Sequence, residues 1–167
     1  MCLFCFKTIT KISDYNRGCE LVYFVDRNKI ENTLNFLEDE LRLFKAQEEW
    51  TSEIEKKALE RIGHTLIECI LDVGNDMIDG FIMRDPGSYD DIMDILTDEK
   101  VVGQTEADSL KHLIASRKTL VQDYLNVNHE ELEKLLHQHA ETLEHFPARI
   151  RDYLNNELGP VSAFKPH

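Results

Sequence analysis

The sequence has few of the residues that mark a disulfide framework, a metal site or a loop-rich fold. Its 167 residues include four cysteines, seven glycines, four prolines and one tryptophan. Three cysteines fall within the first 19 residues, and Cys69 stands alone. Cys2 and Cys5 form a C-x2-C pair, but no second pair of ligands follows. The pattern therefore favours neither a disulfide framework nor a zinc site.

Long apolar runs are also missing. None approaches the roughly 20 residues that a membrane-spanning helix needs, so we expect no membrane association. The opening MCLFCF is too short for the apolar core of a signal peptide, and no small-residue cleavage site follows it. A cytoplasmic location is therefore expected.

Positive charge is scarce as well. The chain has 19 Lys and Arg against 32 Asp and Glu, a formal net charge of −13. Because binding to nucleic-acid phosphates depends on Lys and Arg, this balance argues against broad, nonspecific affinity for nucleic acid. It leaves room for a local basic pocket. The sequence has no glycine-rich phosphate loop, no nucleophile elbow and no HExxH motif.

The sequence does show helical periodicity. Apolar residues recur at three- and four-residue spacing from about residue 26 onwards. Capping pairs mark several starts: Ser52 with Glu55, Ser88 with Asp91, Thr105 with Asp108, and Asn128 with Glu131. The expected helices run from about 26 to 46, from 52 to a stop at 85–87, from 88 through Leu96 with the following turn ended by Gly103, from 105 to about 126, and from 128 through Leu154. Pro147 is expected to kink or split the last one near Phe146. The fold class predicted is an all-α, antiparallel up-down bundle of four to five helices.

The two ends of the chain differ from this helical body. Residues 1–22 hold three of the four cysteines, lack helical periodicity and carry more Lys and Arg than acidic residues. We expect them to be an extension outside the core, residues 23–157 to form the bundle, and residues 158–167 to be a loose tail.

Arg117 lies in the middle of the apolar face of the expected fourth helix. Burying a guanidinium without a partner is costly. Either Arg117 pairs with a carboxylate of its own bundle, such as Asp72 or Asp76, or it meets an anion in a cleft or between two subunits. Lys111 and Lys118 lie nearby and would make the site locally basic.

The histidines give no metal-binding pattern. They lack the spacing that presents two ligands on one helical face, so solvated surface positions are expected. The residues considered are His112, His129, His137, His139 and His145.

The segment Arg117-x4-Gln122-x-Tyr124 resembles the R-x4-H-x-Y motif of the HepT-like branch of the HEPN family. The stretch from Ile67 to Gly74, followed by Ser88-Tyr89 and Ile95-Leu96, is similar to that branch in order and spacing. The resemblance covers roughly residues 23–153.

The resemblance implies a helical bundle that dimerises through its motif helices, forming a homodimer. It also implies a metal-independent endoribonuclease of the toxin type, without a cofactor, neutralised by a small nucleotidyltransferase antitoxin. Carried over by position, Arg117 would bind the scissile phosphate and Lys118 would take the polar position after it. Tyr124 would be the tyrosine that the antitoxin modifies by adenylylation.

Gln122 occupies the histidine position of the motif, and there the pattern breaks. The family chemistry needs a group that takes and returns protons near neutral pH, which imidazole does and an amide does not. Three readings stay open: a ribonuclease of reduced or no activity, a non-catalytic HEPN module that binds nucleotide, RNA or a nucleotidyltransferase partner, and a purely structural Arg117.

Overall fold

The computed structural model of the chain describes residues 25–158. This part consists of helices joined by short connections, without a strand, so the predicted all-α class is confirmed. The segments are α1 (Arg27–Ala46), α2 (Glu53–Gly80), α3 (Tyr89–Asp98), α4 (Gln104–Ala115), α5 (Arg117–Val121), the 3-10 turn η1 (Tyr124–Asn126), α6 (His129–Gln138) and α7 (Ala140–Leu158). The predicted extension over residues 1–22 and all but the first residue of the predicted tail lie outside the described residues.

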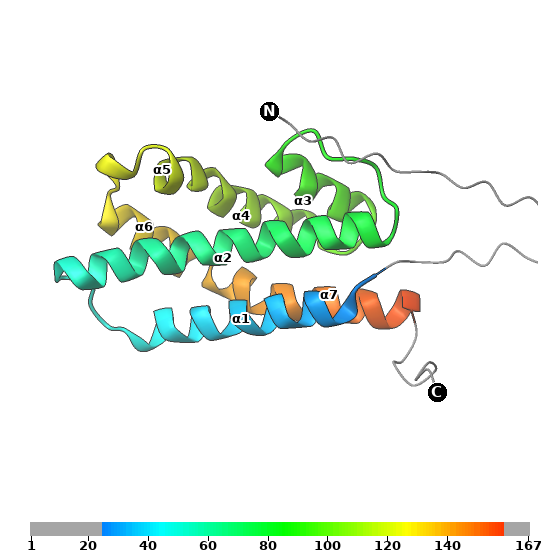
Figure 1. The fold of residues 1–167 in the computed structure, drawn as a ribbon, viewed down its shortest axis with the longest axis horizontal. Coiled ribbons are helices and arrows are strands. Elements are labelled where there is room, and N and C mark those ends of the chain that lie inside the picture. Colours follow the sequence, from blue (N-terminus) through cyan, green and yellow to red (C-terminus); the bar gives the residue numbers. More distant parts are fainter. Residues whose placement is uncertain (1–24, 159–167) are drawn as a thin grey trace, which may run out of the picture.

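The long helix α2 is the centre of the bundle (Figure 1). It crosses the whole molecule, with α1 and α7 on one side and α3, α4 and α5 on the other. α1 runs opposite to α2 and to α7, and α4 runs back along α2, in agreement with the predicted up-down arrangement. Because α2 has neighbours on several sides, its buried residues extend around most of its circumference instead of following one stripe. No helix within residues 25–158 is long and apolar enough to cross a membrane.

Three of the four predicted capping pairs are confirmed. The side chains of Ser52, Ser88 and Asn128 each accept a hydrogen bond from the backbone amide three residues on. At Ser52 the capping box is complete, because the Glu55 carboxylate also accepts the Ser52 amide at 2.7 Å. These starts were predictable because the cap is a local interaction between residues close in sequence.

The fourth helix differs from the prediction at its start and in its middle. It begins at Gln104, where the Gly103 amide donates to the Glu106 carboxylate at 2.9 Å, so the Thr105 cap is wrong. It then breaks at Ser116, whose amide and hydroxyl both bond to the Leu113 carbonyl, at 3.1 and 2.7 Å. A serine hydroxyl that competes for a helical carbonyl in this way bends a helix, and α4 and α5 are the two results.

The fifth helix breaks at His139 and not at Pro147. Pro147 lies buried inside α7, while His139 separates α6 from α7. His139 is 6% exposed, with its ring centroid 5.6 Å from that of His112, so the expected surface position is wrong. Burial, and then the nearby His112, lower the pKa of His139.

Two contacts fix the layers of the bundle. A Cβ atom at Gly74 would lie 2.5 Å from Cγ2 of Ile92, so the absence of a side chain there lets α3 approach α2 closely. On the other side, the Arg151 guanidinium of α7 bonds to the carboxylates of Glu31 and Glu38 on α1, at 2.8 and 2.6 Å. These contacts position α2 and its neighbours around the candidate site.

Candidate functional site

Arg117 is the first residue of α5, where that helix packs on α2. Its Nε donates a hydrogen bond of 2.6 Å to Oε1 of Glu68, and its Cζ lies 4.8 Å from the centroid of the Tyr89 ring. The side chain is 22% exposed. Pairing with a carboxylate of α2 was one of the readings left open, but the expected partners Asp72 and Asp76 are wrong. Glu68 reaches the arginine because α5 crosses α2 at that level.

The Arg117 guanidinium keeps unused hydrogen-bond donors. Its bond to Glu68 uses Nε, and neither Nη nitrogen donates to a residue within the described part of the chain. The hydrogen bond to Glu68 raises the pKa of Arg117, which is therefore charged throughout the physiological range. A fixed planar cation with free outer donors suits a phosphate or carboxylate.

The other residues of the motif do not share the face of Arg117. Lys118 and Gln122 are exposed. The backbone N–H of Gln122 donates to the Lys118 carbonyl at 2.8 Å and caps the end of α5. The helix then ends, and at Asp123 the backbone leaves the helical region with φ −110° and ψ 39°. Tyr124, in the 3-10 turn, is 60% exposed. The expected fourth helix, continuous from 105 to about 126, is therefore wrong.

The local basic patch is smaller than expected. Lys111 forms an ion pair with Asp94 of α3, which raises the pKa of the lysine and uses its charge within the bundle. Of the two lysines expected to flank Arg117, Lys118 is the exposed one.

Three residues that the sequence analysis gave no role contact this site: Glu68, Tyr89 and His64. His64 lies one turn before Glu68 on α2, and its Nε2 is 3.2 Å from Oε1 of Glu68, the oxygen that binds Arg117. The i,i+4 spacing of His64 and Glu68 is visible in the sequence. Nothing in the sequence shows that Arg117, 49 positions later, meets the same oxygen.

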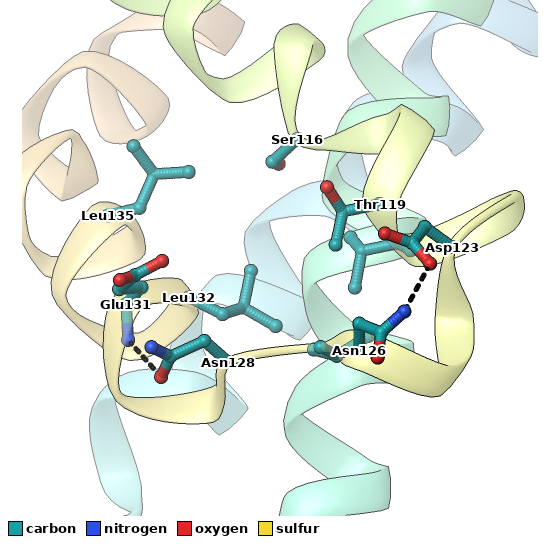
Figure 2. Close-up of a pocket in the computed structure, with 10 residues that line it drawn as sticks. Ser116, Thr119, Asp123, Asn126, Asn128, Glu131, Leu132 and Leu135 are labelled. Atoms are coloured by element: carbon teal, nitrogen blue, oxygen red, sulfur yellow. Dashed lines mark hydrogen bonds between the residues drawn. The ribbon is translucent and has the colours of Figure 1, made fainter.

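Two hollows adjoin the site. A groove of about 340 Å³ runs between α1 and α2, and Arg61 and Glu68 are among its lining residues. On the other flank of the motif segment, a cavity of about 430 Å³ lies between α5, η1 and α6 (Figure 2).

The lining of the larger cavity mixes apolar and polar side chains and includes no cation. Figure 2 shows Asp123 bonded to Asn126, and Asn128 bonded to the backbone of Glu131. Two carboxylates without Lys, Arg or His repel a phosphate. An anion is therefore better placed on the Arg117 side. Within residues 25–158, no group of three or more His, Cys, Asp or Glu side chains is arranged to hold a metal ion.

The helical bundle of residues 25–158 has the same fold as a solved HEPN toxin. A family model described as "HepT-like: Ribonuclease HepT-like" matches residues 30–150, and the chain belongs to this family.

Among individual proteins, the chain is similar to "Putative RNase YutE" of Bacillus subtilis strain 168. The two are 67% identical over 144 residues, which cover 86% of this chain and all of YutE. A solved structure of YutE from Bacillus subtilis, described as a cytosolic protein of unknown function, has a TM-score of 0.82. It is 68% identical to this chain and covers 85% of it and 99% of its own length.

A more distant solved structure shares the fold. It contains a tri-AMPylated HEPN toxin of Shewanella oneidensis in complex with the MNT antitoxin. The similarity has a TM-score of 0.64 at 20% identity and covers 75% of this chain and 95% of the other.

Proposed function

We propose that the chain is a toxin-type RNA endonuclease of the HepT class that cleaves RNA without a metal ion, as a homodimer in the cytoplasm. Family membership and the similarity to YutE support the reaction class. The observation that carries the proposal is Arg117, whose guanidinium is fixed by Glu68 and Tyr89 while both Nη nitrogens stay available. A scissile phosphate is the anion that suits this cation in a ribonuclease.

In this proposal Arg117 binds the scissile phosphate and stabilises the negative charge that grows on it in the transition state. Lys118, exposed beside it, supplies a second positive charge. Gln122 occupies the catalytic histidine position, where its amide forms hydrogen bonds and transfers no proton.

The surface of the motif segment supports dimer formation. Val121, Tyr124 and Leu125 are all exposed and lie close together in sequence. Apolar side chains gathered on one segment favour burial against another surface. A second copy of the chain would cover them and bring two Arg117 side chains towards one cleft.

A nucleotidyltransferase antitoxin is the proposed protein partner. The tri-AMPylated HEPN toxin with MNT antitoxin supports this choice by its shared fold. Tyr124 is the proposed acceptor of the adenylyl group, because most of its side chain is exposed and an enzyme can reach it.

A non-catalytic HEPN module that binds nucleotide, RNA or a nucleotidyltransferase is the second candidate function. Two observations favour it: Gln122 in place of the histidine, and the ion pair that already gives Arg117 a partner within its own chain.

Cleavage of a fluorescently labelled RNA by the purified chain in excess EDTA tests the proposal. Arg117→Ala should lower the cleavage rate by a factor of about 10² or more, and Gln122→His should raise it. Arg42→Ala is the matched control, because Arg42 is exposed on α1 and pairs with Asp39, and it should cleave like the unmodified protein. If neither the unmodified chain nor Gln122→His cleaves above background, the nuclease proposal fails and the binding module stands.

A further inference from the structure

His64 of α2 shares its carboxylate partner with Arg117. Its Nε2 lies 3.2 Å from Oε1 of Glu68, and the same oxygen accepts the Nε hydrogen of Arg117 at 2.6 Å. An imidazole and a guanidinium are therefore held side by side by one atom. The His64 side chain is 30% exposed, so a substrate bound at Arg117 can reach it.

The other histidines of the described residues are engaged elsewhere. His129 pairs with Glu60, His137 lies near Glu133, and the rings of His112 and His139 lie against each other, while His145 is exposed on α7. Among the residues that the structure describes, His64 is therefore the imidazole that the fold brings to Arg117.

The orientation of the ring assigns a role to each nitrogen. We place the ring hydrogen on Nε2, which faces the Glu68 carboxylate, so that Nδ1 carries the lone pair and faces the Arg61 guanidinium. Nδ1 lies 3.5 Å from Nη1 of Arg61, which lines the groove between α1 and α2. A carboxylate that holds one imidazole nitrogen fixes the tautomer and leaves the other nitrogen as the base.

We propose that His64 is the proton-transfer residue of this chain, acting in place of the histidine that Gln122 replaces. This inference rests on the proposed function. With the phosphate on Arg117, Nδ1 of His64 takes the proton of the ribose 2′-hydroxyl while the 2′-oxygen forms a bond to phosphorus. The bond from phosphorus to the 5′-oxygen breaks, and that oxygen receives the proton from His64. The products are a 2′,3′-cyclic phosphate and a 5′-hydroxyl.

Glu68 is the positioning residue in this scheme, because it contacts both His64 and Arg117. The charged groups around His64 are Arg61 and Glu68 on its own helix and Arg117 on α5. Glu40 of α1 accepts a hydrogen bond from the hydroxyl of Thr65, the residue after His64. In the dimer each subunit carries its own set of these groups.

The test measures RNA cleavage and its pH dependence in the full chain for four variants: His64→Gln, His64→Ala, Arg117→Ala and His145→Ala. His64→Gln keeps a side chain of similar size that can donate to Glu68, and it should lose cleavage by a factor of about 10²–10⁴. Its remaining activity should no longer show the pH dependence of an imidazole. Added imidazole should restore part of the activity of His64→Ala, which a merely structural role would not permit. His145→Ala, on the exposed side of α7, should be unchanged.

The outcomes separate this inference from the proposed function. If Arg117→Ala loses cleavage and both His64 variants retain it, the role of His64 is overturned and the nuclease stands. If the His64 variants lose activity that imidazole does not restore, while their thermal unfolding shows them to be folded, proton transfer by His64 is also overturned. If the unmodified chain does not cleave RNA, both proposals fall.

Discussion

The guanidinium of Arg117 lies over the ring of Tyr89, with Cζ 4.8 Å from the ring centroid. Tyr89 is the first residue of α3, so this contact joins the motif segment to a helix that comes 28 positions earlier in the chain. A cation over an aromatic face is attracted by the electrons of the ring, so Tyr89 helps to hold Arg117 in place.

Tyr89→Leu should weaken the hold on Arg117, and Tyr89→Phe should preserve it. At a half-exposed site such a contact contributes about 0.5–1 kcal/mol, so cleavage or RNA affinity should fall about two- to fivefold in Tyr89→Leu alone. Parallel titration of both variants with labelled RNA measures this. Equal behaviour of the two variants would show that the ring face has no part in positioning Arg117.

Arg151→Met should lower the free energy of unfolding by about 1–2 kcal/mol, because charge-assisted hydrogen bonds contribute about this much. The substitution keeps an apolar stem and leaves Glu31 and Glu38 without their shared partner. Urea unfolding is the measurement. Arg42→Met removes one exposed ion pair and should change the free energy of unfolding by no more than about 0.5 kcal/mol. A similar loss in both variants would contradict the role of the α1–α7 network.

Gly74→Ala should destabilise the bundle by about 1–2 kcal/mol. Alanine favours a helix by up to about 1 kcal/mol, but the added Cβ would lie 2.5 Å from the rigid Cγ2 of Ile92, and overpacking costs about 1–3 kcal/mol. Gly87→Ala is the control, since its Cβ would lie 3.6 Å from the nearest atom, a carboxylate oxygen of Asp91. Thermal unfolding of both variants measures the difference in stability. A Gly74→Ala protein as stable as the parent would mean that α3 does not approach α2 this closely.

Cys69 should resist thiol reagents in the folded protein. Burial is the main cause that raises its pKa from about 9 to about 12, which leaves the thiol protonated near neutral pH. Because burial disfavours the thiolate only in the folded state, Cys69 makes its full contribution to the free energy of unfolding below pH 9. That contribution declines as the pH rises from 9 to 12.

Labelling with iodoacetamide at pH 8.5 checks this prediction in a variant whose Cys2, Cys5 and Cys19 are replaced by Ser. Labelling of Cys69 should be slow in buffer and fast in denaturing urea. Fast labelling without urea would place the thiol in contact with solvent and contradict its burial.

Helix positions and most helix starts could be predicted from the sequence because they depend on local signals. Ser52, Ser88 and Asn128 bond to amides three residues away, and the spacing of apolar residues shows which face is buried. The break at His139 had no such signal. The stripe from Leu132 to Leu154 fits one helix as well as two, so Pro147 was the more obvious place for a break, and tertiary packing decided otherwise.

The site could be predicted only in part for the same reason. The unusual position of Arg117 was visible from helical periodicity, and its need for a negatively charged partner, a carboxylate or a bound anion, followed from the cost of burying it. Which carboxylate it meets depends on where α5 crosses α2. His64 and Tyr89 join the site through that crossing and through the position of α3, which no local pattern records.

The breaks at Ser116 and Asp123 leave Arg117 and Lys118 on a helix of five residues. So short a helix does not hold itself together in water, because its few internal hydrogen bonds do not offset the entropy of forming it. The attachments of Arg117 to Glu68 and Tyr89 therefore do more than shape a phosphate site, since they also keep α5 folded against α2. The folding of α5 and the formation of the phosphate site are therefore the same step. A partner that pulls α5 away from α2 would inactivate the site without unfolding the rest of the bundle.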